Sequence, residues 1–208
     1  DVEHNSLYCL TQEEGTELAH RIANKILTVL DEDGQMEMLS VLWKRLEERG
    51  YSHYEVSNFA KPGKECKHNL VYWNLNRYIG LGSSAASFQY DETGAWHYSQ
   101  VQNLADYAKD SPYTGYERES ISIQQHMEEY LMMSLRLQKG VVKKTFFARF
   151  GYSFDSLFAK TIASLDTVWY TDTGYLFALS TDGWMVLDEI ILRLSLAIPA
   201  PLDRHYRI

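Results

Sequence analysis

Residues 54–88 constrain the fold of this chain more than any other stretch, because they combine conformationally costly residue types at short spacing. A strand pattern over 51–57 leads into a Lys-Pro-Gly-Lys turn at 61–64, and the cluster His-Asn-x-x-Tyr-Trp follows at 68–73. The segment 78–87 is rich in small residues and carries two spaced glycines. It lacks the third glycine of a dinucleotide fingerprint and the lysine of a P-loop. We therefore expect these glycines to let the backbone approach a ligand or a neighbouring strand closely.

The N-terminal part alternates strand and helix patterns. Residues 4–10 form a short apolar run that suits a buried strand, and polar residues with a glycine end it. Apolar residues at helical spacing predict helices over 16–30 and, more clearly, over 35–49. A strand that leads through a polar loop into a helix has the geometry of a β/α unit, in which the loops at strand ends form the site.

The strand at 51–57 is expected to alternate, with Tyr54 and Val56 on one face and polar side chains on the other. Beyond the glycine-spaced segment, residues 88–98 predict a hairpin that turns at 91–94. This gives the first domain a mixed α/β character.

A domain boundary is expected in the turn-rich segment 110–120. It follows a short predicted helix over 100–109, in which Val101, Leu104 and Ala108 are expected to face inward. The chain then divides into a first domain, a second domain and a loosely held tail, at 1–112, 113–198 and 199–208.

The second domain has the pattern of a winged-helix-like module. Ser122 and Gln125 match a capping box at the start of a helix. Two phenylalanine-rich helices follow, then a hairpin over 168–177 and a last helix capped by Thr181 or Asp182. The inner face of the first helix is predicted to carry Met127, Tyr130, Leu131, Ser134 and Leu135.

Charge and composition exclude several classes of function. Winged-helix modules often bind DNA, but acidic side chains slightly outnumber basic ones here, and the whole chain of 208 residues has a net charge of −8. We therefore expect no nucleic-acid partner. No apolar run reaches the roughly 18–20 residues of a membrane span, and two distant cysteines do not make a disulfide framework. These features favour a cytoplasmic protein, and the opening at Asp1 suggests that a preceding part is missing.

His68 is the candidate ligand in the polar stretch. A neutral imidazole can bind iron or zinc or accept a proton, and flanking aromatic rings can pack against a flat apolar ligand. In the structural alternative, His68 caps a short helix or hydrogen-bonds the backbone while Tyr72 and Trp73 belong to the core. Cys66 and His68 form a C-x-H pair, but a second pair for zinc is absent, so a zinc site is not favoured. Local chemistry alone favours the structural role of His68, because lone histidines are more often structural than ligating.

The spacing of the whole stretch resembles that of a known family. The motif Tyr-Glu-Val-Ser-Asn-Phe-Ala-Lys-Pro-Gly at 54–63 is followed by Cys-x-His-Asn-x-x-Tyr-Trp at 66–73 and Gly-x-Gly at 80–82. This run resembles the later part of the HemW-type radical S-adenosylmethionine proteins, which are relatives of the oxygen-independent coproporphyrinogen III oxidases. The segment 6–16 and the winged-helix-like end resemble other parts of the same family.

The resemblance implies a fold and a set of ligands. The fold is α/β, the C-terminal part of a partial (β/α) barrel followed by a small winged-helix-like α+β domain. The implied ligands are heme, S-adenosylmethionine and a four-iron, four-sulfur cluster. His68 would bind the heme iron, supported by Asn69, Tyr72 and Trp73. By similarity, the backbone at Thr11 and Ala86 would approach S-adenosylmethionine. The implied partner is a heme-accepting protein.

Two departures from the family pattern limit what this chain can do alone. The C-x-x-x-C-x-x-C triad that holds the cluster is absent, so we expect the chain by itself to be inactive in radical chemistry. Many relatives carry a histidine where this chain has Ala86. The His-Asn-x-x-Tyr-Trp cluster favours a heme chaperone, and the alternatives are a coproporphyrinogen oxidase and a winged-helix adaptor for protein or nucleic acid. Homodimerisation is left open as well.

Overall fold

The computed structural model describes residues 2–109 and 116–199. The chain forms two compact units, Asp1–Cys66 and Lys67–Ile208, and each is described by itself. The expected domain boundary at residue 112 lies outside the described residues and stays a prediction, as does nearly all of the expected tail. In the described part of the chain, no helix is both long and apolar enough to cross a bilayer.

The first unit is a small antiparallel sheet with a long amphipathic helix. The sheet has the order β1-β3-β2, and Leu39 and Trp43 of the long helix are buried. Asp31 caps this helix by accepting a hydrogen bond of 2.9 Å from the backbone N–H of Gly34, and Gly50 follows its end with a φ of 77°. The elements are β1 (His4–Ser6), α1 (Glu17–Ala23), α2 (Glu32–Glu48), β2 (Ser52–Glu55) and β3 (Asn58–Ala60).

Two expectations for the start of this unit are wrong. The expected strand over 4–10 ends at Ser6, and Leu10 is 61% exposed instead of buried. The expected helix over 16–30 ends at Ala23, because Lys25 adopts the left-handed conformation at a φ of 59° and breaks the helical path. An apolar run alone did not reveal either stop.

The expected alternation over 51–57 is also wrong. His53, Tyr54 and Glu55 are all buried, because the register against β3 shifts between His53 and Glu55 in a β-bulge. The chain then turns directly into β3, so a tight hairpin replaces the single expected strand. The turn at 61–64 is confirmed, with the N–H of Lys64 donating to the carbonyl of Lys61 at 2.9 Å.

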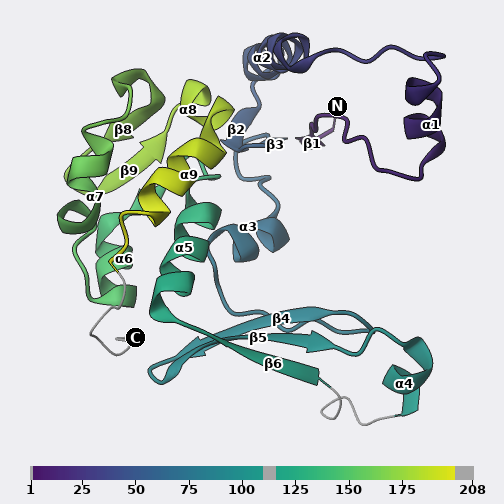
Figure 1. The fold of residues 1–208 in the computed structure, drawn as a ribbon. Coiled ribbons are helices and arrows are strands. Elements are labelled where there is room, and N and C mark those ends of the chain that lie inside the picture. Colours follow the sequence, from purple (N-terminus) through teal and green to yellow (C-terminus); the bar gives the residue numbers. More distant parts are fainter. Residues whose placement is uncertain (1, 110–115, 200–208) are drawn as a thin grey trace. The chain divides into compact units, whose positions relative to one another are not determined.

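The second unit begins with a short helix and a three-stranded sheet (Figure 1). The predicted hairpin is confirmed as β4 and β5 in direct antiparallel register. Residues 116–120, expected to belong to a turn-rich segment, instead form the third strand together with Ile121, and this strand pairs with β5. The expected inward face at 100–109 is wrong as well, since the helix there buries no residue. The elements are α3 (Lys67–Trp73), β4 (Ala86–Asp91), β5 (Gly94–Gln100), α4 (Leu104–Lys109) and β6 (Tyr116–Ile121).

The remainder of this unit is the predicted winged-helix-like module. The capping box of Ser122 and Gln125 is confirmed, and the five expected inner-face residues of the first helix are buried. The single last helix expected after a cap at Thr181 or Asp182 is instead two helices, and Ser180 caps the first, because its hydroxyl accepts from the N–H of Gly183. The sheet order is β7-β9-β8. The elements are α5 (Ile123–Ser134), β7 (Val141–Val142), α6 (Lys143–Phe150), α7 (Phe154–Ile162), η1 (Thr167–Trp169), β8 (Tyr170–Asp172), β9 (Leu176–Leu179), α8 (Thr181–Met185) and α9 (Leu187–Ser195).

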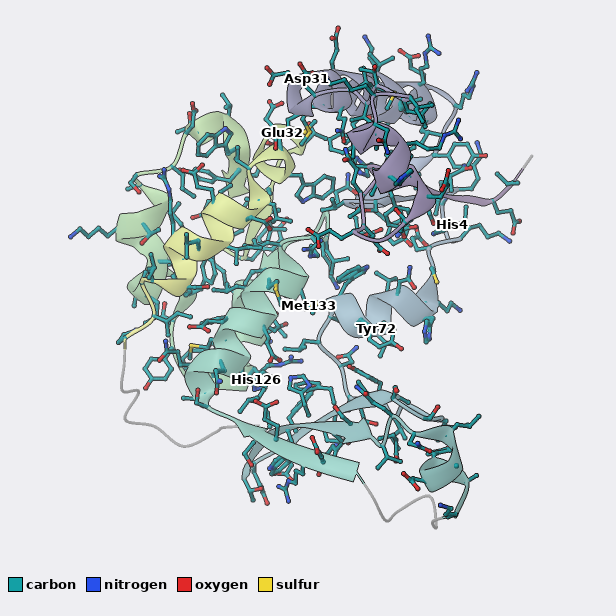
Figure 2. All side chains as sticks on the ribbon, turned by 45° about the vertical axis from the view of Figure 1, so that its right-hand side comes forward. His4, Asp31, Glu32, Tyr72, His126 and Met133 are labelled. Carbon is teal, nitrogen blue, oxygen red and sulfur yellow. The ribbon has the colours of Figure 1, made fainter. Side chains whose placement is uncertain are left out.

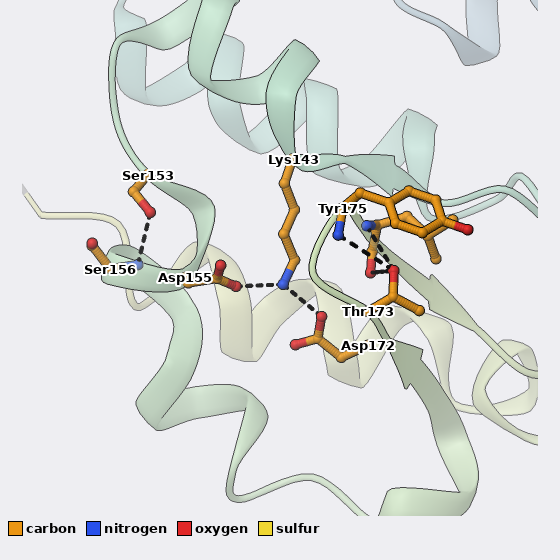
Figure 3. Close-up of polar contacts among 8 residues, drawn as sticks. Lys143, Ser153, Asp155, Ser156, Asp172, Thr173 and Tyr175 are labelled. Carbon is orange, nitrogen blue, oxygen red and sulfur yellow. Dashed lines mark hydrogen bonds and ion pairs between the residues drawn. The ribbon is translucent and has the colours of Figure 1, made fainter.

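An aromatic core and one ion-pair cluster hold this module together. The core packs ring against ring with edge-to-face and tilted contacts at 4.9–5.9 Å between centroids. Lys143, whose side chain is 11% exposed, lies 2.5 Å from both Asp155 and Asp172 and so ties α6 to α7 and β8 (Figure 3). Burial alone would lower the pKa of Lys143, but the hydrogen bonds to the two carboxylates outweigh it and raise that pKa. The core rings are Phe146, Phe150, Phe154, Phe158 and Phe177.

Candidate functional site

The candidate ligand His68 lies exposed on α3, one helical turn before Tyr72. Its Nε2 and the Tyr72 hydroxyl are 3.2 Å apart and share a hydrogen bond whose donor depends on the imidazole tautomer. The two rings meet edge to face at 4.9 Å between centroids. The spacing of four residues brings the two side chains to one face of the helix. A ligand can therefore reach His68 from solvent, with Tyr72 as its immediate neighbour.

Asn69 and Trp73 occupy the adjacent face of α3, and both are half-buried. The guanidinium carbon of Arg136 lies 5.6 Å from the centroid of the Trp73 ring, within cation–π range. The structure therefore brings together His68 and Tyr72, whereas Trp73 packs toward the Arg136 side chain.

An apolar cavity of about 220 Å³ lies beside Tyr72. The Tyr72 ring meets the Tyr78 ring edge to face at 4.6 Å, and burial raises the pKa of Tyr78. Figure 2 shows Tyr72 on α3 and Met133 on α5, and these two helices pack against each other. The lining residues are Tyr72, Leu75, Tyr78, Phe88, His97, Glu129, Met132 and Met133. Methionine and tyrosine side chains suit a flat apolar ligand, because they adapt in shape and offer large surfaces.

One polar pair in the cavity wall was missed by the sequence analysis. His97 on β5 donates from Nε2 to the Glu129 carboxylate on α5 at 2.8 Å. The hairpin register places His97 directly opposite Phe88, and that pairing followed from the predicted turn. The contact with Glu129 requires knowing how α5 packs on the sheet, which no local pattern gives.

A second histidine near the cavity is sealed off from solvent. His126 on α5 is completely buried, and its ring lies 5.6 Å from Phe88 and 5.0 Å from Phe150 between centroids. Burial, helped by the nearby Arg149 charge, lowers the pKa of His126 to about 3. This imidazole is neutral at ordinary pH, and a ligand cannot reach it from solvent.

The two residues expected near S-adenosylmethionine fall in different units. Thr11 is exposed in the irregular segment after β1, and Ala86 is exposed at the start of β4. A Cβ atom at Gly80 would lie 2.1 Å from the Ala86 carbonyl oxygen, so the predicted close backbone approach at this glycine is confirmed. The N–H of Gly80 also donates to the Ser87 hydroxyl at 2.9 Å.

The residues of this chain do not fit an iron–sulfur cluster. Its two cysteines, exposed Cys9 and half-exposed Cys66, cannot supply the three thiolates of the family motif. Within residues 2–109 and 116–199, no three His, Cys, Asp or Glu side chains gather in a way that could hold a metal ion. A heme iron is different, since the porphyrin supplies four ligands and the protein needs to add only one.

The sequence of this chain matches a known protein family. Residues 121–197 match the family model described as the HemN C-terminal domain. The chain is 30% identical over 165 residues to the protein named heme chaperone HemW of Bacillus subtilis, covering 79% of this chain and 43% of that protein. It is also 30% identical over 198 residues to heme chaperone HemW of Lactococcus lactis, covering 90% of this chain and 51% of that protein. The chain belongs to the HemW type.

The fold agrees with that assignment. A solved structure described as coproporphyrinogen III oxidase (HemN) from Escherichia coli, a radical SAM enzyme, matches with a TM-score of 0.56. The match covers 81% of this chain and 42% of that structure at 13% identity, so it shows the fold alone. The expected α/β fold with a HemN-like C-terminal domain is confirmed. The HemW-type chain spans about half the length of the relatives named above, at 43% and 51%.

Proposed function

We propose that this HemW-type chain carries the heme-binding surface of a heme chaperone, with His68 as the iron ligand. The observation that carries the proposal is the exposed imidazole on α3, held 3.2 Å from the Tyr72 hydroxyl, with an apolar cavity beside the same tyrosine. A surface site suits a cargo that must be released again, because a partner protein can approach it directly. The two HemW relatives are named heme chaperones, which supports the same function here.

The chemistry of ligation follows from the imidazole and its neighbour. A neutral imidazole donates a nitrogen lone pair to iron. If Nε2 is the ligating atom, its hydrogen bond with the Tyr72 hydroxyl must break first, at a net cost of about 1 kcal/mol. The Tyr72 ring then remains available to pack against the porphyrin. Asn69 and Trp73 support the site from the adjacent face of α3.

The remaining ligands and partners belong to the complete protein in this proposal. Thr11 and Ala86 present backbone groups to S-adenosylmethionine, and the iron–sulfur cluster is held by residues outside this chain. The heme leaves to an acceptor protein, and a homodimer is one arrangement in which this can occur. The net charge of −8 supports the expectation that nucleic acid is not a partner.

A heme titration followed by the Soret absorbance tests the ligand. We expect the unmodified chain to shift the Soret band and His68→Ala to lose that shift. His20→Ala is the matched control, because His20 is also an exposed helical histidine and lies on α1 in the other unit. An unchanged Soret band in His68→Ala would remove this residue as the ligand.

The coproporphyrinogen oxidase function is the alternative, and the HemN structure named above shares the fold. It predicts oxidative decarboxylation of propionate side chains to vinyl groups by the complete protein. Product analysis of coproporphyrinogen incubated with the complete, cluster-loaded protein separates the two functions. Vinyl products would favour the oxidase, whereas heme binding without them supports the chaperone.

A further inference from the structure

A small polar pocket of about 130 Å³ follows directly on the end of α3. Asn74 and Asn76 line it together with Lys139 and Arg149, which bring two positive charges. All of its lining residues belong to the unit Lys67–Ile208. The pocket is thus a built feature of one unit and lies next to the proposed heme surface in the sequence.

The two cations are held in place by neutral groups. The Lys139 ammonium donates to the Asn74 side-chain oxygen at 2.6 Å. Arg149 donates to the carbonyl of Leu75 at 3.0 Å and to the hydroxyl of Tyr90 at 3.2 Å. Its guanidinium also lies between the rings of Tyr90 and Tyr130, at 4.8 and 4.9 Å from their centroids.

Neither cation has an anionic partner within the described part of the chain. The carboxylates there that form ion pairs do so with other residues. Partial burial lowers the pKa of Lys139, as expected for an ammonium group without a neighbouring carboxylate. Two cations with amide and hydroxyl groups and no carboxylate form a site for an anion, and guanidinium and ammonium groups bind carboxylates with charge-assisted hydrogen bonds.

The position of the pocket indicates which anion it takes. Leu75 lines the apolar cavity with Tyr72, while its backbone carbonyl accepts from Arg149 at the basic pocket. One residue therefore connects an apolar cavity with a cationic one. Heme has the matching shape, an apolar macrocycle with two carboxylates on one edge. The basic pocket is too small for the macrocycle but large enough for a carboxylate.

We propose that the pocket formed by Asn74, Asn76, Lys139 and Arg149 binds a propionate of the porphyrin carried on α3. This deepens the proposed function and rests on it. The contact fixes the in-plane orientation of the macrocycle, because one edge is anchored by charge while the opposite edge packs on apolar side chains. It also makes recognition depend on a free carboxylate.

Hemin and hemin dimethyl ester, which lacks the two negative charges, test the proposal. Affinities are measured for both ligands by quenching of tryptophan fluorescence, since Trp73 lies on α3. Lys139→Gln is the test variant, because Lys139 is exposed overall and its loss should not disturb the core. Arg149 is left intact because it also donates to Leu75 and Tyr90. Lys160→Gln, an exposed lysine on α7, is the charge-matched control.

We expect Lys139→Gln to weaken hemin binding about two- to fivefold, the size of a partly exposed charge pair. The ester should bind the unmodified chain more weakly than hemin and should bind both variants alike. Equal losses for hemin and the ester in Lys139→Gln would overturn the proposal, as would equal affinity of the unmodified chain for the two ligands. Calorimetry with inorganic phosphate alone tests for a free anion instead. Tight phosphate binding that needs Lys139, without a hemin–ester difference, would also overturn it.

Failure of the subsite and failure of the chaperone function give different results. If hemin and its ester both bind with equal affinity and a shifted Soret band, the propionate assignment is wrong while heme binding stands. If neither ligand binds, the proposed function itself is wrong.

Discussion

The surface around α3 and the core of the winged-helix-like module use the same residue types in opposite ways. His126 is completely buried among aromatic rings, and its pKa is lowered to about 3. His68 has an aromatic neighbour too, but it is exposed and touches a hydroxyl. A histidine beside aromatic rings is therefore a candidate ligand only where solvent reaches it, since burial removes both its access and its charge.

The largest expected difference between the two regions concerns stability. Phe158 is fully buried and contacts Phe146 and Phe154, so Phe158→Ala should lower the free energy of unfolding by about 3–5 kcal/mol. Tyr72→Ala on the half-exposed α3 surface should cost much less, about 1 kcal/mol. Urea unfolding followed by circular dichroism measures both. Similar losses for the two variants would show that α3 belongs to the core.

The pH dependence of stability should come from the buried histidine. The folded pKa of His126 is about 3 and the unfolded value is 6.5, so below pH 6.5 the unfolded chain binds a proton that the folded chain does not. The contribution of neutral His126 to the free energy of unfolding is therefore fully present above pH 6.5. It falls as the pH drops toward 3, by about 2 kcal/mol at pH 5. Unfolding midpoints from pH 7 to pH 5 measure this slope.

His126→Leu should make that slope shallower, because leucine does not titrate and suits the apolar surroundings. Some slope should remain, since burial also lowers the pKa of His53 in the other unit to about 4. His68→Ala is the control for the exposed region and should leave the slope unchanged. A slope that survives in His126→Leu at its full size would assign the acid sensitivity to other groups.

The Lys143 cluster should contribute less than the aromatic core. Lys143→Met removes the ammonium that lies between Asp155 and Asp172 and leaves two carboxylates near each other. Because Asp155 is 56% exposed, water screens part of the loss, and we expect about 1–2 kcal/mol. Lys144→Met, a neighbouring exposed lysine, should change the free energy of unfolding by less than about 0.5 kcal/mol. Equal effects of the two variants would show that the cluster adds nothing to stability.

The sequence predicted the winged-helix-like module well, because its core and its helix start follow local rules. The capping box at Ser122 and the buried stripe through Met127 and Leu131 needed only helical periodicity. The N-terminal segment failed because a single left-handed residue, Lys25, ended a helix whose pattern continued. Strand β6 was missed because its charged residues do not have the pattern of a strand. It forms through its pairing with β5.

The candidate site was predicted only in part, for a similar reason. His68 and Tyr72 stand one helical turn apart, so the sequence placed them together. The wall residues His97 and Glu129 come from a strand and a helix that are 32 positions apart, and only the packed structure joins them. The basic pocket likewise joins Asn74 to Lys139 across 65 positions. Sites of this kind depend on tertiary packing, which overrides what short windows of sequence can show.

The smallest expected effect concerns the Tyr72 hydroxyl, which contacts the exposed His68. Tyr72→Phe keeps the ring that packs against Tyr78 but removes the hydrogen bond to His68 Nε2. If Nε2 ligates the iron, that bond opposes binding, so the variant should bind heme about two- to fivefold more tightly, as expected for one weak hydrogen bond. Tyr107→Phe is the control, because its hydroxyl accepts from Gly82 away from α3. Weaker heme binding in Tyr72→Phe would mean that the hydroxyl holds the imidazole in its ligating orientation, and that iron is bound through Nδ1.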